Sequence, residues 1–336
     1  MVTVTIKDVA RAAGVSPATV SRVFNETAPV DDETRARVLS AAEALRYVPN
    51  ATARSLITSR TATVGVLLPD LHGALRGELL RGLGEAARRR GFDLLISSAH
   101  GDPDGAISAL RAMRGRVDGV ILMMPHGEAD ALLRELPAAQ PVVLLGASSV
   151  RPDIAVVAVD EAGGAEAMVR HLVRHGHRRI ALLAGADGDG AMEARVLGYR
   201  QALADAGIQS DTALEIVGAT TEDGGHASAG RALALAPPPT AIFAASDALA
   251  AGALAALRDA GIAVPDEMAV AGFGDTPIAR YLSPALSSVR VPATELGRLA
   301  IDRMLLAVAR GGRTGSRDVL ECVVMPRASC GVHEQG

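Results

Sequence analysis

The chain has 336 residues, of which 49% are hydrophobic and 21% are charged. This composition is typical of a globular protein and excludes intrinsic disorder, and the length predicts two or three domains rather than one core. No apolar run is long enough to cross a bilayer, and the charged N-terminal residues are not those of a secretory signal. We therefore expect a cytoplasmic protein without membrane contact. Its two cysteines, Cys322 and Cys330, are expected to be free thiols.

The net charge of −4 is divided unevenly along the chain. Residues 1–60 contain eight Lys and Arg residues against six Asp and Glu residues, a net charge of +2, which leaves −6 for the remainder. This difference is too small to establish nucleic-acid binding by itself. Evidence for a nucleic-acid partner must therefore come from motifs.

The N-terminal region has the pattern of three short helices. The first is expected to end at Gly14, and the second to begin with Ser16 as N-cap and Pro17 at the first helical position. The third is expected to follow an N-cap at Asp31. The apolar positions expected to face inward are Ile6, Val9, Ala10 and Ala13, then Val20, Val23 and Phe24, then Val38, Ala41, Ala42 and Leu45. Two helices joined by a tight turn form the unit whose second helix fits the major groove of DNA.

Two strings in this region resemble a known family. Residues 5–25, TIKDVARAAGVSPATVSRVFN, and residues 47–56, YVPNATARSL, are similar to the N-terminal signature and the hinge segment of the lactose/galactose-repressor (LacI/GalR) family. The resemblance implies a sequence-specific transcriptional regulator, by family habit a repressor, with a small all-α helix-turn-helix domain at residues 1–48 and a hinge helix and linker at 49–60. The alternative is a helical hairpin used only for packing, which does not explain the outward Thr, Ser, Arg and Asn side chains of the second helix.

The residues expected to contact DNA divide by chemistry into base and phosphate contacts. Arg22 can donate two parallel hydrogen bonds to guanine O6 and N7. Pro17 and Ala18 lie where the family reads bases, and because both are apolar they are expected to favour thymine methyl groups or to shape the fit. The groups expected to fix the register on phosphates belong to Thr5, Ser16, Thr19, Ser21, Asn25, Tyr47 and Asn50. Double-stranded operator DNA is the expected partner.

The hinge segment is expected to become helical only on DNA. Asn50 can serve as its N-cap, and Ala53, Leu56 and Ile57 make one short apolar face. A helix of about eight residues is unstable alone in water, so it is expected to form when two copies pack together on the duplex. Leu56 is then expected to enter the minor groove as a wedge between base pairs, and Ala53 is counted with it among the DNA-binding residues. The alternative is a plain linker with an isolated leucine.

From residue 61 onward, short apolar runs alternate with helix-length spacers. Such runs are typical of parallel strands covered by helices on both faces, and their number predicts a two-lobed α/β body that binds ligand at strand C-termini. The resemblance implies the periplasmic-binding-protein-like fold for this body, residues 61–336. It implies an N-terminal lobe at about residues 62–160 and 291–318 and a C-terminal lobe at about 161–290 and 319–330. The chain would then pass between the two lobes three times. Such a body can sense a ligand by hinge closure.

The resemblance also implies an effector site between the lobes. Arg195 corresponds to the family's ligand-gripping arginine, for which the alternative is a solvated helix arginine. Asp160 corresponds to a carboxylate of the cleft. Asp247 starts a helix, where capping that helix is an equal alternative to ligand contact. The other positions that match this site are Leu75, Arg76, Thr220 and Asp275.

The expected effector site departs from the family's pattern in its aromatic and acidic residues. Leu75 and Arg76 stand in the segment where the family carries two phenylalanines, and Thr220 stands at a commonly aromatic position. One of two usual aspartates is missing beside Asp275. A flat ring therefore lacks its stacking partners. Arg76 and Arg195 together suit an anionic carbohydrate, such as a sugar acid or a sugar phosphate, whose binding is expected to change operator affinity.

Three histidines, His171, His175 and His177, invite a zinc interpretation, but the sequence places no further ligand cluster near them. They are more simply the basic end of a helix that Gly176 stops. No Walker motif, nucleophile elbow or Cys–His pair is present, so we expect no metal, no cofactor and no enzyme activity. A sugar-binding transport component is the other alternative, and it has no use for a helix-turn-helix. No apolar heptad extension follows the last strand, which favours a homodimer.

Overall fold

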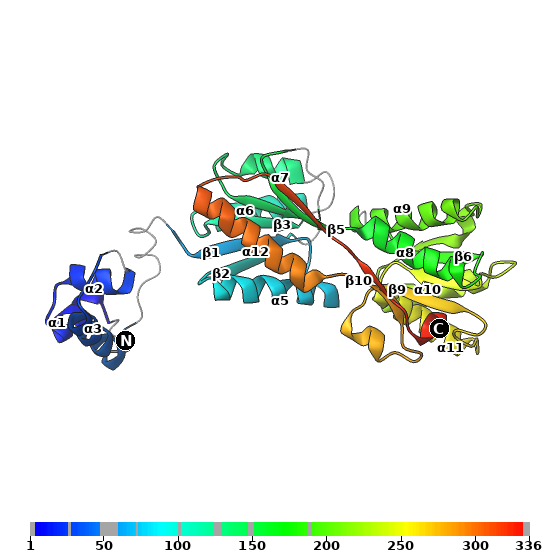
Figure 1. Ribbon diagram of the computed structural model, residues 1–336, viewed down its shortest axis with the longest axis horizontal. Coiled ribbons are helices and arrows are strands. Elements are labelled where there is room, and N and C mark those ends of the chain that lie inside the picture. Colours follow the sequence, from blue (N-terminus) through cyan, green and yellow to red (C-terminus); the bar gives the residue numbers. More distant parts are fainter. Residues whose placement is uncertain are drawn as a thin grey trace. The chain divides into compact units, whose positions relative to one another are not determined.

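The computed structural model describes residues 4–25, 28–47, 60–71, 73–99, 102–123, 129–146, 151–186 and 190–331. The chain divides into two compact units, one formed by residues 1–63 with 115–118 and the other by residues 64–114 with 119–336. Figure 1 shows helices at the N-terminal end of the chain, and two sheets with their helices in the second unit.

Three helices begin the first unit, as the sequence predicts: α1 (Ile6–Ala13), α2 (Pro17–Asn25) and α3 (Asp32–Ala44). Gly14 ends α1 in a left-handed conformation with φ 67°, which favours glycine and makes the tight turn into α2. The expected inward positions form a small apolar core, of which the buried members are Val9, Ala10, Ala13, Val20, Val23, Val38 and Ala42.

The second unit contains two six-stranded sheets, and the first has the strand order β11-β5-β4-β3-β1-β2. Its strands are β1 (Thr63–Leu68), β2 (Asp93–Ser98), β3 (Gly119–Met123), β4 (Val142–Leu145), β5 (Ala155–Val159) and β11 (Ser316–Leu320). β1 pairs in parallel with β3, β3 with β4, β4 with β5, and β5 with β11. The inner strands are almost entirely buried, which explains their continuous Val, Ile and Leu runs.

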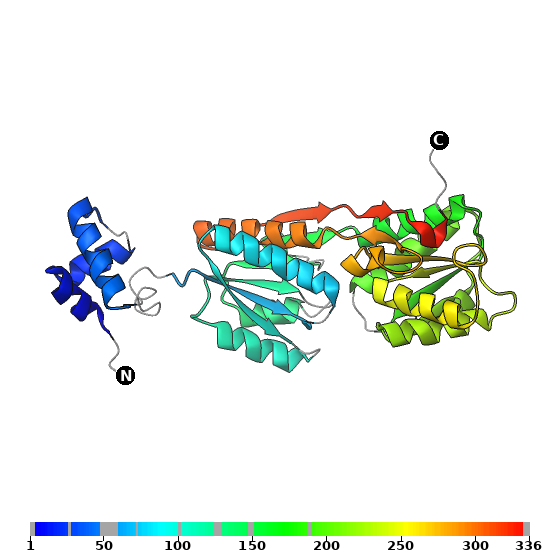
Figure 2. The same cartoon turned by 90° about the horizontal axis from the view of Figure 1, so that it is seen from below.

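Helices cover both faces of the first sheet: α5 (Ala74–Arg89), α6 (Pro103–Met113), α7 (Ala129–Glu135) and α12 (Ala293–Arg310). α5 and α12 lie side by side on one face, and α6 and α7 cover the other (Figure 2). The two paired helices approach closely at Gly82, where an added Cβ atom would lie 2.1 Å from the Thr294 carbonyl oxygen. A residue with a side chain would therefore separate α5 from α12. We call this sheet with its helices the first lobe.

The second sheet has the order β12-β10-β9-β8-β6-β7, and β12 runs antiparallel to β10 while the other pairs are parallel. Its strands are β6 (Ile180–Gly185), β7 (Glu215–Gly218), β8 (Ala241–Ala244), β9 (Ala269–Gly274), β10 (Ser287–Arg290) and β12 (Val323–Met325). Two helix pairs cover it, α8 (Glu161–Arg174) with α9 (Gly190–Asp205), and α10 (Glu222–Leu233) with α11 (Asp247–Asp259). Short 3₁₀ turns are Thr212–Leu214, Pro277–Arg280 and Ala328–Cys330. This is the second lobe.

The chain passes between the two sheets three times, after β5, after β10 and after β11. The expected fold class, a helical DNA-binding domain followed by a two-lobed α/β body, is therefore confirmed. The domain limits expected at residues 48 and 60 stay a prediction, because residues 48–59 lie outside the described part of the chain.

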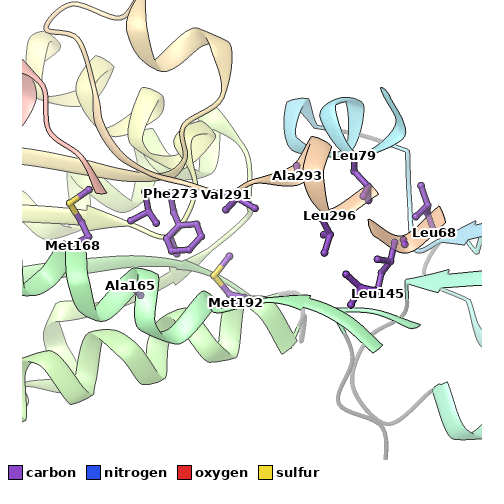
Figure 3. Close-up of a cluster of buried hydrophobic side chains, with 14 of the residues drawn as sticks. Leu68, Leu79, Leu145, Ala165, Met168, Met192, Phe273, Val291, Ala293 and Leu296 are labelled. Atoms are coloured by element: carbon purple, nitrogen blue, oxygen red, sulfur yellow. The ribbon is translucent and has the colours of Figure 1, made fainter. Parts of the chain in front are cut away.

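An apolar cluster draws buried side chains from both lobes (Figure 3). Leu68 and Leu296 belong to the first lobe, whereas Met168 and Phe273 belong to the second. A separate cluster packs α10 and α11 against the other face of the second sheet. The buried polar or charged residues among those described are Arg195, Ser228, Asp247, Ser287, Ser288 and Ser329. All six lie in the second lobe or its final segment, so polar structure concentrates there.

Candidate functional site

The outward face of α2 carries the expected base-reading residues. Pro17, Ala18 and Arg22 are exposed, whereas Val20 and Val23 on the same helix are buried. Within the described part of the chain, the Arg22 guanidinium has no hydrogen bond or ion pair. A guanidinium held on a packed helix with its donors uncommitted can bind a guanine edge through two parallel hydrogen bonds.

The polar groups expected to contact phosphates are hydrogen-bonded to one another along α2. Ser16 Oγ accepts from the Thr19 N–H at 3.1 Å and lies 2.9 Å from Thr19 Oγ1, so Ser16 is the N-cap that the sequence predicts. Asn25 Nδ2 donates to Ser21 Oγ at 3.0 Å. Because a hydroxyl both donates and accepts, these groups keep capacity for a phosphate oxygen while their orientation is fixed.

Thr5 and Tyr47 stabilise the ends of helices in addition to being expected phosphate contacts. The Thr5 hydroxyl and N–H donate to Asp8 Oδ2 at 2.7 and 3.0 Å, and these bonds, aided by the nearby Arg11 charge, hold the pKa of Asp8 below its usual value. The Tyr47 ring lies 5.8 Å from the Phe24 ring, centroid to centroid, and is tilted by 60°. Tyr47 therefore packs the end of α3 against α2.

The expected hinge contacts lie outside the described residues. Asn50, Ala53 and Leu56 all fall within residues 48–59. The helix that forms on DNA and the leucine wedge therefore stay predictions.

The residues expected to bind the effector all follow strand C-termini. They are Leu75 and Arg76 after β1, Asp160 after β5, Arg195 on α9 after β6, Thr220 after β7, Asp247 after β8 and Asp275 after β9. Because parallel strands run in one direction, these residues gather at one edge of each sheet, where open α/β sheets bind ligands. A cavity of about 460 Å³ has Leu75 of the first lobe and Asp275 of the second among its lining residues.

Arg195 is buried and connects four elements of the second lobe. Its Nε donates to Glu161 Oε2 at 2.8 Å, and its Nη1 donates to the Ala245 carbonyl oxygen at 2.7 Å. The guanidinium carbon lies 4.2 Å from the centroid of the Phe273 ring, a cation–π contact. The residue is 8% exposed, so the alternative of a solvated helix arginine is wrong. Arg195 connects α9 with the start of α8 and the ends of β8 and β9.

Asp247 is a buried acceptor rather than a helix cap. It is 2% exposed and accepts from the Thr276 N–H at 2.6 Å, the Thr276 hydroxyl at 2.8 Å and the Ser288 hydroxyl at 2.6 Å. Ser246 caps α11 instead, by accepting from the Leu249 N–H at 3.2 Å, so the capping alternative is wrong. Burial raises the pKa of Asp247, because the loss of water outweighs these hydrogen bonds. Asp247 therefore holds the loop that follows β9.

Asp275 is committed to two arginines. One carboxylate oxygen accepts from Arg290 Nε at 2.7 Å and the other accepts from Arg327 Nη2, and the side chain is fully buried. The Asp275 N–H donates to Ser288 Oγ at 3.0 Å, and its backbone has φ 48°. Arg290 ends β10 and Arg327 follows β12, so this carboxylate joins the end of β10 to the segment that follows its paired strand β12.

Two further expected effector residues also have protein partners. Arg76 donates from Nε and Nη2 to the two carboxylate oxygens of Asp70, at 2.9 and 2.8 Å, and its Nη1 lies 3.6 Å from Met123 Sδ. Asp160 is the N-cap of α8 and accepts from the Gly163 N–H at 2.8 Å. Arg76, Arg195 and Asp275 are therefore each paired with an opposite charge within the protein.

Sequence reasoning missed the residues that balance these charges. Glu161 directly follows the expected Asp160, and the two neighbouring carboxylates were a signal that one of them could serve Arg195. Arg290 and Arg327 carried no such signal, because each stands far from Asp275 in the sequence and belongs to no local motif.

The histidine cluster closes the end of α8. Gly176 has φ 92° just after His175, the C-cap, as expected of a helix stop. The His171 and His175 rings lie 4.3 Å apart, and His171 Nε2 lies 3.2 Å from the thiol of Cys330. Among the described residues, no group of three His, Cys, Asp or Glu side chains is arranged to hold a metal ion. Burial lowers the pKa of His171 to about 4, helped by the positive charges near it.

No helix in the described part of the chain is long and apolar enough to span a membrane.

Comparison with known proteins gives two family matches. Residues 5–50 match the bacterial regulatory proteins of the lacI family, and residues 169–330 match the periplasmic binding protein-like domain. The HTH-type transcriptional regulator GalR of Escherichia coli (strain K12) is 35% identical over 305 residues, which cover 88% of each chain.

Two solved structures are similar over nearly the whole chain. The transcriptional regulator CelR–cellobiose complex has a TM-score of 0.73 and 32% identity, covering 97% of this chain and 99% of that one. The lac repressor dimer bound to operator and the anti-inducer ONPF has a TM-score of 0.88 and 28% identity with the same coverage. Both similarities therefore extend over the helical N-terminal region, which carries Arg22, and over the two-lobed body, which carries Arg195.

Proposed function

Because the chain belongs to the lacI family of bacterial regulatory proteins, we propose that it is a repressor that binds operator DNA as a homodimer and changes its operator affinity when a sugar binds between its lobes. The family consists of transcriptional regulators and not enzymes, as the sequence predicts. The observation that carries the proposal is the exposed Arg22 on α2, which has no partner among the described residues. A regulator that binds operator DNA works in the cytoplasm, so the proposal includes that location.

The DNA-binding part of the proposal uses two copies of α2. The similar lac repressor structure is a dimer bound to operator, and a dimer of this chain would place its two α2 helices in major-groove half-sites about one helical turn apart. Arg22 then reads a guanine in each half-site. Asn50, Ala53 and Leu56 are assigned to the hinge helix, whose leucine enters the minor groove between the half-sites.

The ligand part of the proposal favours an uncharged carbohydrate. The CelR relative is described in complex with cellobiose, a neutral sugar. In this chain Arg76 is paired with Asp70 and Arg195 with Glu161, so neither arginine offers an unpaired positive charge to a ligand. These ion pairs weaken the expectation of a sugar acid or sugar phosphate, because an anion would have to displace a carboxylate already in place.

The experiment that tests this function selects bound sequences from a random duplex library at one salt concentration, with and without cellobiose, ribose, gluconate or glucose 6-phosphate. We expect a short palindrome whose affinity changes with a neutral sugar. Recovery of no sequence by the folded chain would refute the proposal, and a response confined to gluconate or glucose 6-phosphate would refute its ligand class.

Arg22→Ala and Arg37→Ala form a matched pair on the selected operator, because Arg37 is an exposed arginine on α3 outside the expected interface. Arg22→Ala should lose about 1–3 kcal/mol of discrimination between the operator and a duplex with the guanine changed. Arg37→Ala should retain it. Full discrimination by Arg22→Ala would contradict the base-reading role.

A further inference from the structure

One carboxylate holds the backbone where the N-terminal region enters the first strand of the first sheet. Asp118 Oδ1 accepts from the Thr61 N–H at 2.6 Å and from Thr61 Oγ1 at 2.9 Å, and Asp118 Oδ2 accepts from the Ala62 N–H at 2.9 Å. The Asp118 N–H donates in turn to the Thr63 carbonyl oxygen at 2.8 Å. We call this arrangement of Thr61, Ala62 and Asp118 the Asp118 clamp.

The Asp118 clamp holds a conformation that the chain would not adopt by preference. Ala62 has φ 51°, in the left-handed region that a Cβ atom disfavours. A residue persists in that region when surrounding contacts determine its backbone. The two carboxylate oxygens of Asp118 supply these contacts, so this one side chain sets the direction in which the chain reaches β1.

The Asp118 clamp and the effector residues lie at opposite ends of the same two strands. β1 begins directly after Ala62, β3 begins directly after Asp118, and the two strands pair in parallel along their length. At their C-terminal ends, Asp70 follows β1 and Met123 ends β3. Arg76 contacts both residues, through its paired bonds to Asp70 and its Nη1 near Met123 Sδ. A displacement of Arg76 therefore acts on both β1 and β3, the two strands whose N-terminal ends meet at the Asp118 clamp.

We propose that Asp118 is the positioning residue that connects the effector edge of the first lobe to the DNA-binding region. This inference rests on the proposed function, since it assigns a residue to the coupling between sugar and operator. The clamp joins the N-terminal ends of β1 and β3, so a displacement of this strand pair carries residues 61 and 62 with it. Without the carboxylate these residues lose their fixed direction and no longer follow the displacement.

The test compares the full-length wild type with Asp118→Ala, Asp118→Asn and the control Asp211→Ala. Asp211 also accepts from a backbone N–H and a side chain, at Ala213 and Arg179, but it lies in the second lobe. The measured quantity is the ratio of dissociation constants for a scrambled duplex and for the operator selected from the random library. Circular dichroism and the midpoint of thermal unfolding check that each variant folds.

Asp118→Ala should lower this ratio about tenfold or more, a magnitude usual for coupling between distant sites. Asp118→Asn should lower it less, because the amide oxygen still accepts one side of the clamp, and Asp211→Ala should stay within about twofold of the wild type. If cellobiose or ribose shifts operator binding by the wild type, the same sugar should shift it less in Asp118→Ala while its own dissociation constant stays unchanged.

The possible failures are distinguishable. A wild-type ratio retained by folded Asp118→Ala would overturn the inference and leave the proposed function standing. An equal loss in Asp211→Ala would also overturn it, because the effect would then be general destabilisation. A wild type that selects no operator would overturn the proposed function and the inference with it. If Asp118→Ala does not fold, Asp118→Asn becomes the test: a lowered ratio of dissociation constants would support the inference, and a wild-type ratio would overturn it.

Discussion

Replacement of Arg195 by methionine should destabilise the second lobe more than the same replacement of an exposed arginine. Methionine keeps most of the length of the side chain and removes the charge. Glu161 would then remain beside α9 without its cation, although its side chain is only 12% exposed. The Ala245 carbonyl would lose a donor at 2.7 Å, and the Phe273 ring would lose its cation–π partner.

The magnitude follows from the burial of both partners. Removing one member of a buried ion pair costs about 3–5 kcal/mol, chiefly because the remaining charge stays buried and unpaired. The exposed Arg170 offers a matched control, since its ion pair with Glu166 joins side chains that are 45% and 28% exposed. Arg170→Met should therefore cost less than about 1 kcal/mol.

The assay is urea unfolding of the full chain followed by far-ultraviolet circular dichroism. The double variant Arg195→Met with Glu161→Gln should recover at least about 1 kcal/mol relative to Arg195→Met, because no unpaired carboxylate remains. A cost below that of Arg170→Met would refute the structural role of Arg195. A double variant no more stable than Arg195→Met would refute the unpaired charge as the cause.

Two further predictions concern packing and pH. Gly82→Ala should lower the free energy of unfolding in urea by about 1–3 kcal/mol or more, because its Cβ atom would lie 2.1 Å from the Thr294 carbonyl oxygen. In Gly84→Ala, on the same helix, the Cβ atom would meet nothing within 4 Å, so this variant should stabilise the protein by about 0.5–1 kcal/mol. Equal effects of the two substitutions would contradict the close helix contact. The folded-state pKa of His171 lies at about 4, below its ordinary 6.5, so the unfolded chain binds the proton more tightly and stability should fall as pH drops from about 6.5 toward 4. The midpoint of thermal unfolding of His171→Gln should fall less over this interval than that of the wild type, and identical falls would exclude His171 as a cause.

Local pattern was sufficient for the helices and strands but not for the charge partners. The spacing of Val9, Val20 and Val38 predicted three buried helix faces, because a helix face repeats within a few residues. The partner of Arg195 is 34 residues away and one partner of Asp275 is 52 residues away. No periodicity reports contacts over such separations, since they arise when the sheets assemble.

The anionic ligand expected from the sequence stays a prediction, and it depended on the charges of two arginines. Arg76 and Arg195 were counted as free positive charges because no carboxylate partner was assigned to either from the sequence, although Asp70 is only six residues from Arg76. The alternative of Asp247 as the cap of α11 was wrong, since Ser246 and Asp247 are adjacent and both residue types cap helices. Only the position of Thr276 in space decides that Asp247 turns away from the helix end.

In the proposed coupling, the direction of the parallel strands would let a change at the effector residues reach the linker without a relay of side chains. The C-terminal ends of β1, β3, β4, β5 and β11 lie at one edge of the first sheet, where the effector residues are expected, so their N-terminal ends, where the linker joins β1, lie at the opposite edge. Strands of this length span roughly 17–20 Å. β1 and β3 are almost entirely buried and closely packed, and such an interior transmits displacement rather than absorbing it. At the linker end of these strands, the Asp118 carboxylate fixes the backbone of Thr61 and Ala62 by hydrogen bonds.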